Sequence, residues 1–379
     1  MRLISLKYSQ WDQGGNNWSI EDFSCAKINL IVGQNSIGKS RTINVINGLS
    51  SMLIGKEIKI GYAQYKAYFK DQEDLIEYLL EYDNYKIVKE TLKIGDTFFL
   101  EREEDGIGSI YADQLKQQIK FQVPDTSIAS VVKRDSIQHP FLQRLYNWGE
   151  STRLYRFGTS LGKENLAIFK ETPPSEEERR KIDVRNTSNV VVFLKQAIKD
   201  FGDSFVSSIL DDINRLGYNL TDIGVAPIVN SVISTPMLDV PEGIYIKEAE
   251  HDHIVEQIEI SQGLFRSLSL FIQLRFSERY SQPSLILIDD IGEGLDYERS
   301  TKLIQNIIDI AESENIQLIM TTNDRFVMNN VSLEYWSVMK REGSCCHFIN
   351  SKDHKELFDD FDLTGLSNFD FFTSKYYNK

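Results

Sequence analysis

Residues 33–40 read GQNSIGKS, a turn with a glycine at each end that leads into a lysine and a hydroxyl. The turn fits the pattern G-x-x-x-x-G-K-[ST], in which backbone N–H groups curl around phosphate oxygens and the following helix N-terminus adds favourable partial charge. In that arrangement Lys39 reaches the β- and γ-phosphates of a nucleotide, and Ser40 holds Mg²⁺. An apolar run at 27–32 precedes the turn and helical spacing at 40–53 follows it. These flanks favour a phosphate loop over a chance glycine-rich turn.

Two adjacent carboxylates end a second apolar run, LILIDD at 285–290. Beside a phosphate loop, Asp289 would anchor the hydration shell of Mg²⁺, and Asp290 would orient or deprotonate the water that attacks the γ-phosphate. Such a strand is common and weak evidence when it stands alone. After a complete phosphate loop it indicates nucleotide hydrolysis.

Three shorter motifs accompany these two. The segment ISQGLFR at 260–266 puts Ser261 and Gly263 where a helix begins, and a helix N-terminus can face an anion. An ordinary helix capped by Ser261 is the alternative. The segments GLD at 294–296 and MTTND at 320–324 follow in the chain.

In this order the five elements resemble the ABC-type P-loop ATPases of the SMC, RecF and OLD-related class, which are standalone prokaryotic AAA-type ATP-binding proteins. The resemblance covers roughly residues 1–110 and 240–340. It implies that 260–266 is the signature, whose helix points at the γ-phosphate bound by the opposite subunit. It also implies that 294–296 is the D-loop, which couples the two sites, and that Asn323 stands at the position of the switch histidine.

The resemblance implies which residues bind ATP and Mg²⁺, which are catalytic, and how subunits assemble. The residues expected to bind ATP are Gly33, Asn35, Gly38, Lys39, Ser40, Arg41, Ser261, Gly263 and Asp296. Mg²⁺ would be held by Ser40 and Asp289, and the expected catalytic residues are Lys39, Asp290 and Asn323. One subunit cannot complete its own site, so two subunits in a head-to-tail homodimer, or a higher homo-oligomer, would trap ATP between them.

Two departures from the family pattern predict slow turnover. The family usually has glutamate after the first aspartate, where this chain has Asp290. A carboxylate shorter by one methylene sits farther from the water, and a misplacement of ~1 Å can cost on the order of 10²-fold in rate. Asn323 in place of histidine removes a titratable sensor of the γ-phosphate. We therefore expect a long-lived ATP-closed state rather than a fast motor.

The pattern of elements predicts an α/β fold, and the resemblance implies that this fold is a P-loop ABC-type ATPase head. Alternating strands and helices predict a parallel core sheet. Period-two alternation over 64–112 predicts an antiparallel β lobe, and 137–220 reads as mostly helical. We expect a first ATPase lobe at 1–135, an inserted helical subdomain at 136–240 and a second ATPase lobe at 241–379.

Composition excludes several classes of protein. The 379 residues carry a net charge of −14, which argues against a protein that coats DNA with a basic surface but leaves room for a local basic groove. Three cysteines are too few for a Cys₄ zinc site and suggest a reduced, cytoplasmic protein. No run of ~18 apolar residues occurs, so we expect no membrane span.

Three functional classes remain open. The resemblance favours the sensor or regulatory ATPase subunit of a prokaryotic defence or DNA-surveillance system that controls an effector protein in trans. A RecF-like DNA repair clamp is the first alternative, with DNA as a possible partner. The nucleotide-binding subunit of an ABC transporter fits less well, because the wording L-S-G-G-Q is missing and the β meander and helical insert are present.

Several features are assigned to structure rather than to chemistry. Segments 250–253 and 345–347 each lack enough metal ligands and are interpreted as a polar turn and a strand. Arg266 could contact phosphate or a partner, with an ion pair as the equal alternative. Gln64 could serve as a Q-loop residue, although an ordinary strand position is favoured. The aromatic segment 368–372 is expected to pack on the body of the protein or on a partner.

Overall fold

The computed structural model describes residues 1–12, 14–15, 17–168, 183–228, 240–250, 253–314 and 316–378. The strands are β1 (Arg2–Gln10), β2 (Trp18–Ser24), β3 (Ile28–Val32), β4 (Ala63–Asp71), β5 (Asp74–Asp83), β6 (Lys86–Ile94), β7 (Thr97–Arg102), β8 (Ile107–Ala112), β9 (Gln117–Gln122), β10 (Thr152–Arg156), β11 (Leu220–Pro227), β12 (Glu242–Glu248), β13 (Ile254–Glu256), β14 (Leu285–Asp289), β15 (Gln317–Thr322), β16 (Trp336–Glu342) and β17 (Cys345–Asn350). The α-helices are α1 (Lys39–Leu53), α2 (Ala129–Val132), α3 (Leu142–Glu150), α5 (Val190–Phe201), α6 (Asp203–Arg215), α7 (Gln262–Tyr280), α8 (Tyr297–Ser313), α9 (Arg325–Asn330), α10 (Lys355–Asp362) and α11 (Asn368–Thr373).

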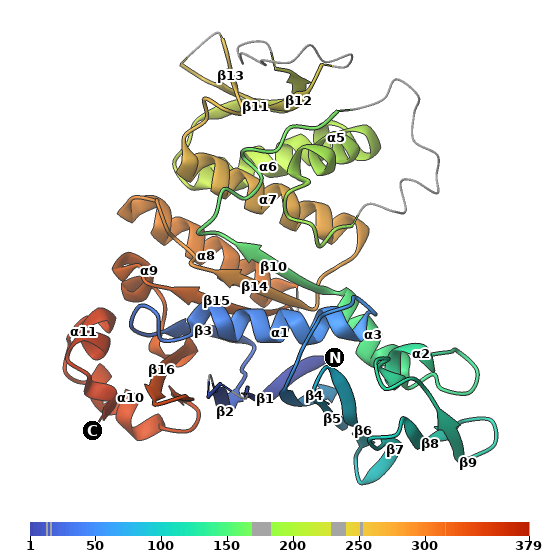
Figure 1. Ribbon diagram of the computed structural model, residues 1–379. Coiled ribbons are helices and arrows are strands. Elements are labelled where there is room, and N and C mark those ends of the chain that lie inside the picture. The colour runs from blue at the N-terminus through green and yellow to red at the C-terminus, as the bar shows by residue number, and fades with distance from the viewer. Residues whose placement is uncertain are drawn as a thin grey trace.

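A single large sheet organises the chain. Its strand order is β10-β14-β15-β3-β16-β17-β2-β1-β4-β5-β6-β7-β8-β9. The strands β10, β14, β15, β3 and β16 are mutually parallel, as expected for a core sheet with helical crossovers. Helix α1 covers one face of this part, and α7 and α8 lie on the other side (Figure 1).

The parallel strands are apolar throughout because both of their faces are covered. Leu285 and Leu287 of β14 pack in the core that includes α1, whereas Ile286 and Ile288 pack in the core that includes α7 and α8. Successive residues of a strand point to opposite faces, so a continuous apolar run is what two buried faces require. This is why the short runs in the sequence identified the core strands.

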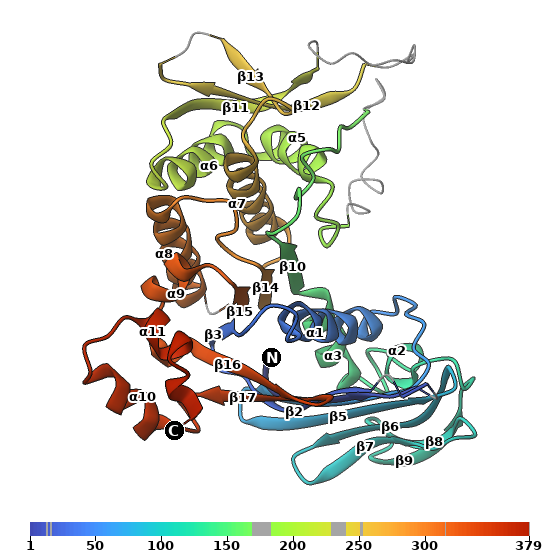
Figure 2. The same ribbon diagram turned by 60° about the vertical axis from the view of Figure 1, so that its left-hand side comes forward.

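The antiparallel meander at 64–112 is confirmed, and it continues through β9. It joins the core sheet through β1, which pairs with β2 on one side and with β4 on the other. Figure 2 shows the long strands of this lobe lying under α1.

The prediction of a mostly helical segment at 137–220 needs one correction, because the segment contains β10. This strand pairs in parallel with β14 and forms one edge of the large sheet. Its Arg153 is fully buried, and the guanidinium donates to the carbonyl oxygens of Glu150, Thr152 and Ser281. The hydrophobic pattern did not reveal this strand because a buried arginine, whose guanidinium is satisfied by backbone carbonyl oxygens, interrupts its apolar residues.

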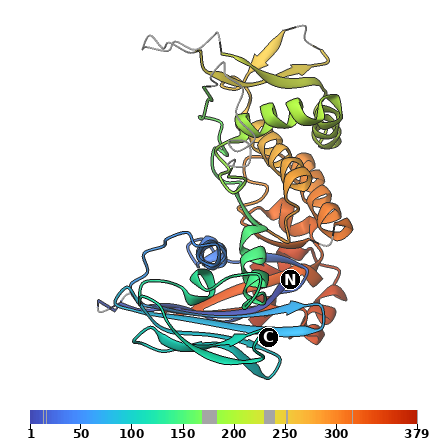
Figure 3. The same ribbon diagram turned by 90° about the vertical axis from the view of Figure 1, so that its right-hand side faces the viewer.

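Helices α5 and α6 pack on α7, and the sheet β11-β12-β13 lies beyond them at the end remote from the core sheet (Figures 1 and 3). The apolar stripe of α6 is core, as expected: Phe205, Ile209 and Ile213 have no exposed surface. The aromatic segment also packs on the body, where Phe371 is fully buried against Trp336, Phe358 and the residues that follow it. Among the described residues, no helix combines the length and apolar character needed to cross a bilayer.

Candidate nucleotide-binding site

The turn between β3 and α1 requires glycine at position 38, the second glycine of the motif, for steric reasons. Gly38 has φ of 124°, and a Cβ at this position would lie 3.0 Å from the Met339 Cε and 3.2 Å from the Trp18 Cζ2. Helix α1 begins at Lys39 with no side-chain cap and no acidic residue in its first turn. Its first N–H groups are therefore left for an external acceptor, which is the arrangement that binds a phosphate.

Lys39 lies at the centre of the site. Its Nζ donates to the carbonyl oxygens of Gly33 at 2.8 Å and Gln34 at 3.1 Å, and to the Oδ1 of Asn323 at 2.5 Å. Burial lowers the pKa of Lys39, and the charges of Asp290 and Asp289 partly oppose that shift. The ammonium is thus surrounded by oxygen atoms, a set of ligands that phosphate oxygens can replace.

The two carboxylates at the end of β14 are held by one hydroxyl from β15. Thr321 donates to the Oδ1 of Asp289 at 2.6 Å and accepts from the backbone N of Asp290 at 2.9 Å. Asp290 has φ of 56°, a left-handed conformation that aspartate adopts more readily than most residues. Burial raises the pKa of the Asp290 carboxyl, and the negative charges of Asp289 and Glu293 raise it further, whereas Lys39 lowers it.

A cavity of about 450 Å³ opens beside these groups. It is lined by Trp18, Asn35, Ser36, Gly38, Lys39, Ser40, Arg41, Asp290, Asn323 and Arg341. The structure therefore brings together seven of the expected residues from three separate parts of the chain. Gly33 contacts the site through its carbonyl oxygen, and Asp289 through the shared Thr321 hydroxyl.

Trp18, Ser36 and Arg341 also line the cavity, although none of them was predicted as a site residue from the sequence. Arg341 lies three residues beyond Val338, where the parallel pairing of β16 with β3 ends, and the carboxyl ends of parallel strands meet at one edge of a sheet. No pattern in the sequence predicted that β16 would pair with β3. Trp18 holds the guanidinium of Arg41 4.3 Å from its ring centroid, and Arg41 also donates to Gln10.

Ser261, Gly263 and Asp296 do not line this cavity. Ser261 caps α7 and accepts a hydrogen bond from the backbone N of Leu264 at 3.4 Å. Asp296 caps α8 in the same way and pairs with Arg299 at 2.6 Å. Gly263 packs so closely on the D-loop segment that a Cβ would lie 2.8 Å from the carbonyl oxygen of Gly294.

Among the described residues Arg266 forms no ion pair, and a contact with phosphate or with a partner stays a prediction. Its guanidinium donates to three backbone carbonyl oxygens, those of Gly158, Thr159 and Glu293. It thereby ties the start of α7 to the loop after β10 and to the segment that follows Asp290. Gln64 is an ordinary strand residue that donates to Glu81 on β5, in agreement with the favoured interpretation. Segment 250–253 falls partly outside the described residues.

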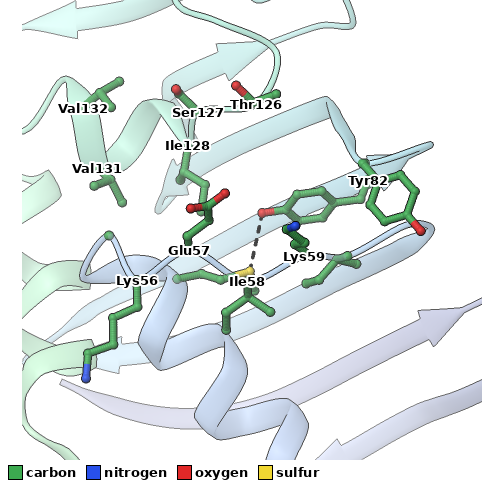
Figure 4. A pocket seen from close by; sticks show the side chains of 14 residues that line it. Lys56, Glu57, Ile58, Lys59, Tyr82, Thr126, Ser127, Ile128, Val131 and Val132 are labelled. Atoms are coloured by element: carbon green, nitrogen blue, oxygen red, sulfur yellow. Dashed lines mark hydrogen bonds between the residues drawn. The ribbon is translucent and has the colours of Figure 1, made fainter.

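A second cavity, of about 660 Å³, lies between the end of α1 and the β lobe (Figure 4). Tyr82 lines it and donates to the sulfur of Met52 at 3.4 Å, while Lys56 pairs with Asp183. A helix of 15 residues is about 22 Å long. This cavity therefore lies at the opposite end of α1 from the phosphate loop and plays no part in the site described above.

By sequence, no family model and no curated protein match the chain. Solved structures do match it. An SMC head bound to the C-winged helix domain of ScpA is 13% identical, with a TM-score of 0.51 over 94% of this chain and 100% of the other. An SMC head domain with an extended coiled coil, bound to the C-terminal domain of ScpA derived from Pyrococcus furiosus, is 12% identical, with a TM-score of 0.50 over 95% and 99%. The chain thus has the fold of the SMC head, which is the ABC-type fold of P-loop ATPases.

Proposed function

We propose that this chain binds ATP with Mg²⁺ and hydrolyses it slowly as a head-to-tail homodimer, in which Ser261 and Gly263 of one subunit complete the site of the other. The observation that carries the proposal is the surrounding of Lys39. Oxygen atoms from the phosphate loop and from Asn323 hold its ammonium next to two carboxylates, at a helix N-terminus that lacks a side-chain acceptor.

The residues present fit a Mg–triphosphate. Gly38 lines the cavity at a position where a Cβ would meet Trp18 and Met339, so the turn has room only for glycine there. Ser40 lines the cavity, and Asp289 has its carboxylate oriented by the Thr321 hydroxyl; these two would hold Mg²⁺. The metal would neutralise charge on the transferring phosphoryl group. Asp290 and Asn323, 3.5 Å apart, would position the attacking water.

Slow turnover follows from the geometry of Asp290. The positive φ at this residue favours a short polar side chain, so the local backbone is suited to aspartate rather than to the longer glutamate. The carboxylate consequently reaches less far into the cavity. We infer that the ATP-bound, closed dimer persists for a long time before ATP is hydrolysed. A long-lived closed state suits a protein that signals through that state.

The absence of Ser261 and Gly263 from the residues that line the cavity supports completion of the site by a second subunit. Gly263 nevertheless packs on Gly294, and Arg266 ties the same helix to the loop after Asp290. The N-terminus of α7 is therefore fixed relative to the hydrolytic segment of its own subunit, while Ser261, which caps the helix, is exposed. A second copy related by two-fold symmetry can present this helix end to the phosphate.

Two substitutions at Ser261 test this arrangement with the fold held constant. Aspartate and asparagine both cap helices as well as serine does. Ser261→Asp would place a carboxylate against the phosphate of the partner, and Ser261→Asn is the matched neutral control. With ATP and Mg²⁺, light scattering should show dimers for the wild type and for Ser261→Asn but monomers for Ser261→Asp, and all three chains should bind ATP. Dimerisation of Ser261→Asp at wild-type ATP concentrations would disprove a role for this helix end.

A mixing experiment tests whether the site is shared. Lys39→Ala removes the lysine that binds phosphate in the subunit's own site. Ser261→Asp blocks the helix end that the subunit presents to the site of its partner. Each variant alone should be inactive. A mixture contains one intact composite site in every mixed dimer, so hydrolysis should return. If the mixture stays inactive while mixed dimers form, the site is not composite.

We propose further that this cytoplasmic ATPase regulates a separate effector protein in a prokaryotic defence or DNA-surveillance system. In support, both solved heads reported above have a domain of another protein bound. The ATP-closed dimer should hydrolyse ATP slowly, and an effector protein encoded nearby should copurify with it. DNA-stimulated hydrolysis without such a partner would instead favour the RecF-like clamp, and retention of a membrane permease would favour the transporter subunit.

A further inference from the structure

Three side chains with different donor atoms gather on the sheet away from the nucleotide site. They are Glu21 on β2 and Cys345 and His347 on β17, and their ligand atoms all lie within 4.8 Å of one another. His347 Nδ1 is 2.7 Å from the Glu21 carboxylate. Carboxylate, thiolate and imidazole together are a donor set that zinc-like divalent ions accept.

The register of the two strands explains why these donors meet. Strands β17 and β2 are parallel, with Cys345 opposite Ser19 and Cys346 opposite Ile20. Alternate residues of a strand share a face, so Cys345, His347 and Glu21 all lie on the same face of the sheet. Glu21 follows Ile20 just as His347 follows Cys346, which places these two side by side. Segment 345–347 alone offers too few ligands for a metal, and the third donor, Glu21, lies more than 300 residues away in the sequence.

The opposite face of β17 carries Cys346, which belongs to a different environment. Its buried thiol donates to the carbonyl oxygen of Ile37 in the phosphate loop, at 3.8 Å. The three-donor cluster is therefore on the far side of the sheet from the nucleotide cavity. It lies on the side of the C-terminal helices, where Ile349 packs in the core that includes α10 and α11.

We propose that Glu21, Cys345 and His347 bind one zinc-class divalent cation, with water as the fourth ligand. The cluster is open to solvent: the side chains of His347 and Glu21 are 36% and 64% exposed. In a tetrahedral site with bonds of about 2.0–2.3 Å, ligand atoms lie about 3.3–3.8 Å apart. The present separations need only small rotations of exposed side chains to reach that range.

The neighbouring charges on β16 are compatible with this site. In the β16–β17 register Glu342 is opposite Cys345 and Lys340 is opposite His347. Glu342 adds negative charge beside the thiol, while the Lys340 ammonium lies 6.0 Å from the ring centroid of Tyr377. A simple ion pair between His347 and Glu21 is the competing explanation, and it gives Cys345 no role. A role for Cys345 therefore distinguishes the metal site from the ion pair.

Cobalt substitution of the full-length chain tests the site without reference to ATP. The protein is stripped of metal with a chelator and titrated with Co²⁺ in the absence of nucleotide. Binding through Cys345 should produce a thiolate-to-cobalt charge-transfer band in the near ultraviolet and the visible bands of tetrahedral cobalt, with one ion per chain. Zn²⁺ should abolish both. A titration that shows no charge-transfer band overturns the proposal.

Variants identify the ligands. Cys345→Ser should remove the charge-transfer band, and His347→Gln and Glu21→Gln should weaken Co²⁺ binding by about tenfold or more. Cys25→Ser is the matched thiol control, because Cys25 is buried elsewhere, and it should leave the spectrum unchanged. A band that survives Cys345→Ser, with the circular dichroism of each variant unchanged, contradicts the assignment. Nucleotide binding, measured separately with Mg²⁺, reports on the phosphate loop and not on this site.

Discussion

The ammonium of Lys39 donates a 2.5 Å hydrogen bond to the Oδ1 of Asn323, which lies 284 residues further along the chain. Asn323 in turn donates to the carboxylate of Asp290 at 3.5 Å. One amide therefore connects the ammonium of Lys39 to the carboxylate of Asp290. A histidine at this position would offer a ring nitrogen to each neighbour, but it would change charge near neutral pH.

Asn323→Ala should slow hydrolysis more than it weakens binding. The substitution removes an oriented dipole between Lys39 and Asp290, and loss of one such group in a preorganised site costs about 10²-fold in rate. The phosphate loop itself stays intact, so ATP affinity should change little. Single-turnover hydrolysis and equilibrium binding of a fluorescent ATP analogue measure the two effects. An equal loss in both would show that Asn323 serves binding alone.

Asp290→Asn should trap the ATP-bound dimer. An amide cannot accept the proton of the attacking water, and loss of a general base reduces rates by about 10²–10⁴-fold. The side chain keeps its size and its tolerance of a positive φ, so folding and closure should persist. Scattering in the presence of ATP should show dimers of longer lifetime than in the wild type. Hydrolysis at the wild-type rate would remove Asp290 from the mechanism.

The pH profile of hydrolysis should have an acid limb that belongs to Asp290. Burial and the charges of Asp289 and Glu293 raise the pKa of this carboxyl above 3.8. The base is active only when ionised, so the rate falls as the pH falls through that raised pKa. Single-turnover rates across the acid range measure this limb. An identical acid limb in Asp290→Asn would assign the titration to another group.

The same pKa shift predicts an effect on stability. Since the pKa of Asp290 is higher in the folded chain than in the unfolded chain, its contribution to stability is present at low pH and is lost as the pH rises through the folded-state pKa. Asp290→Asn should therefore raise the melting temperature at neutral pH relative to the wild type. The gain should shrink in acid. A difference that is constant with pH would attribute the change to packing instead.

Arg266→Met should destabilise the protein through the backbone it holds. The guanidinium donates to the carbonyl oxygens of Gly158, Thr159 and Glu293, and hydrogen bonds from a charged group contribute about 1–3 kcal/mol. Urea unfolding should show a loss of this order. Arg215→Met, at an exposed position on α6, is the matched control and should change stability by less than about 0.5 kcal/mol. Equal effects of the two substitutions would show that the three carbonyl contacts contribute nothing.

The parts of the site that are local in sequence were predictable, and the parts that depend on strand order were not. Lys39 lies in a motif that follows one short apolar run, and Asp290 ends another, so the two motifs together with these runs predicted that both residues lie beyond the ends of buried strands. Trp18 and Arg341 reach the same cavity from β2 and β16, which pair with strands distant in sequence. β10 was hidden because Arg153 interrupts its apolar pattern, and backbone carbonyls that satisfy the guanidinium leave no mark in the sequence.

The sheet runs without a break from β10 to β9, so the strands that carry the phosphate loop and those of the β lobe share one ladder of hydrogen bonds. A continuous sheet resists hinge bending between its strands, so the β lobe and the phosphate loop should move together as one unit. The helices α5 and α6 and the sheet β11-β12-β13 lie outside that ladder and meet the rest largely along α7. If ATP is bound as proposed, a change at the phosphate loop can therefore reach these outer elements mainly through α7, and the first turn of the same helix is the part proposed to meet a second subunit.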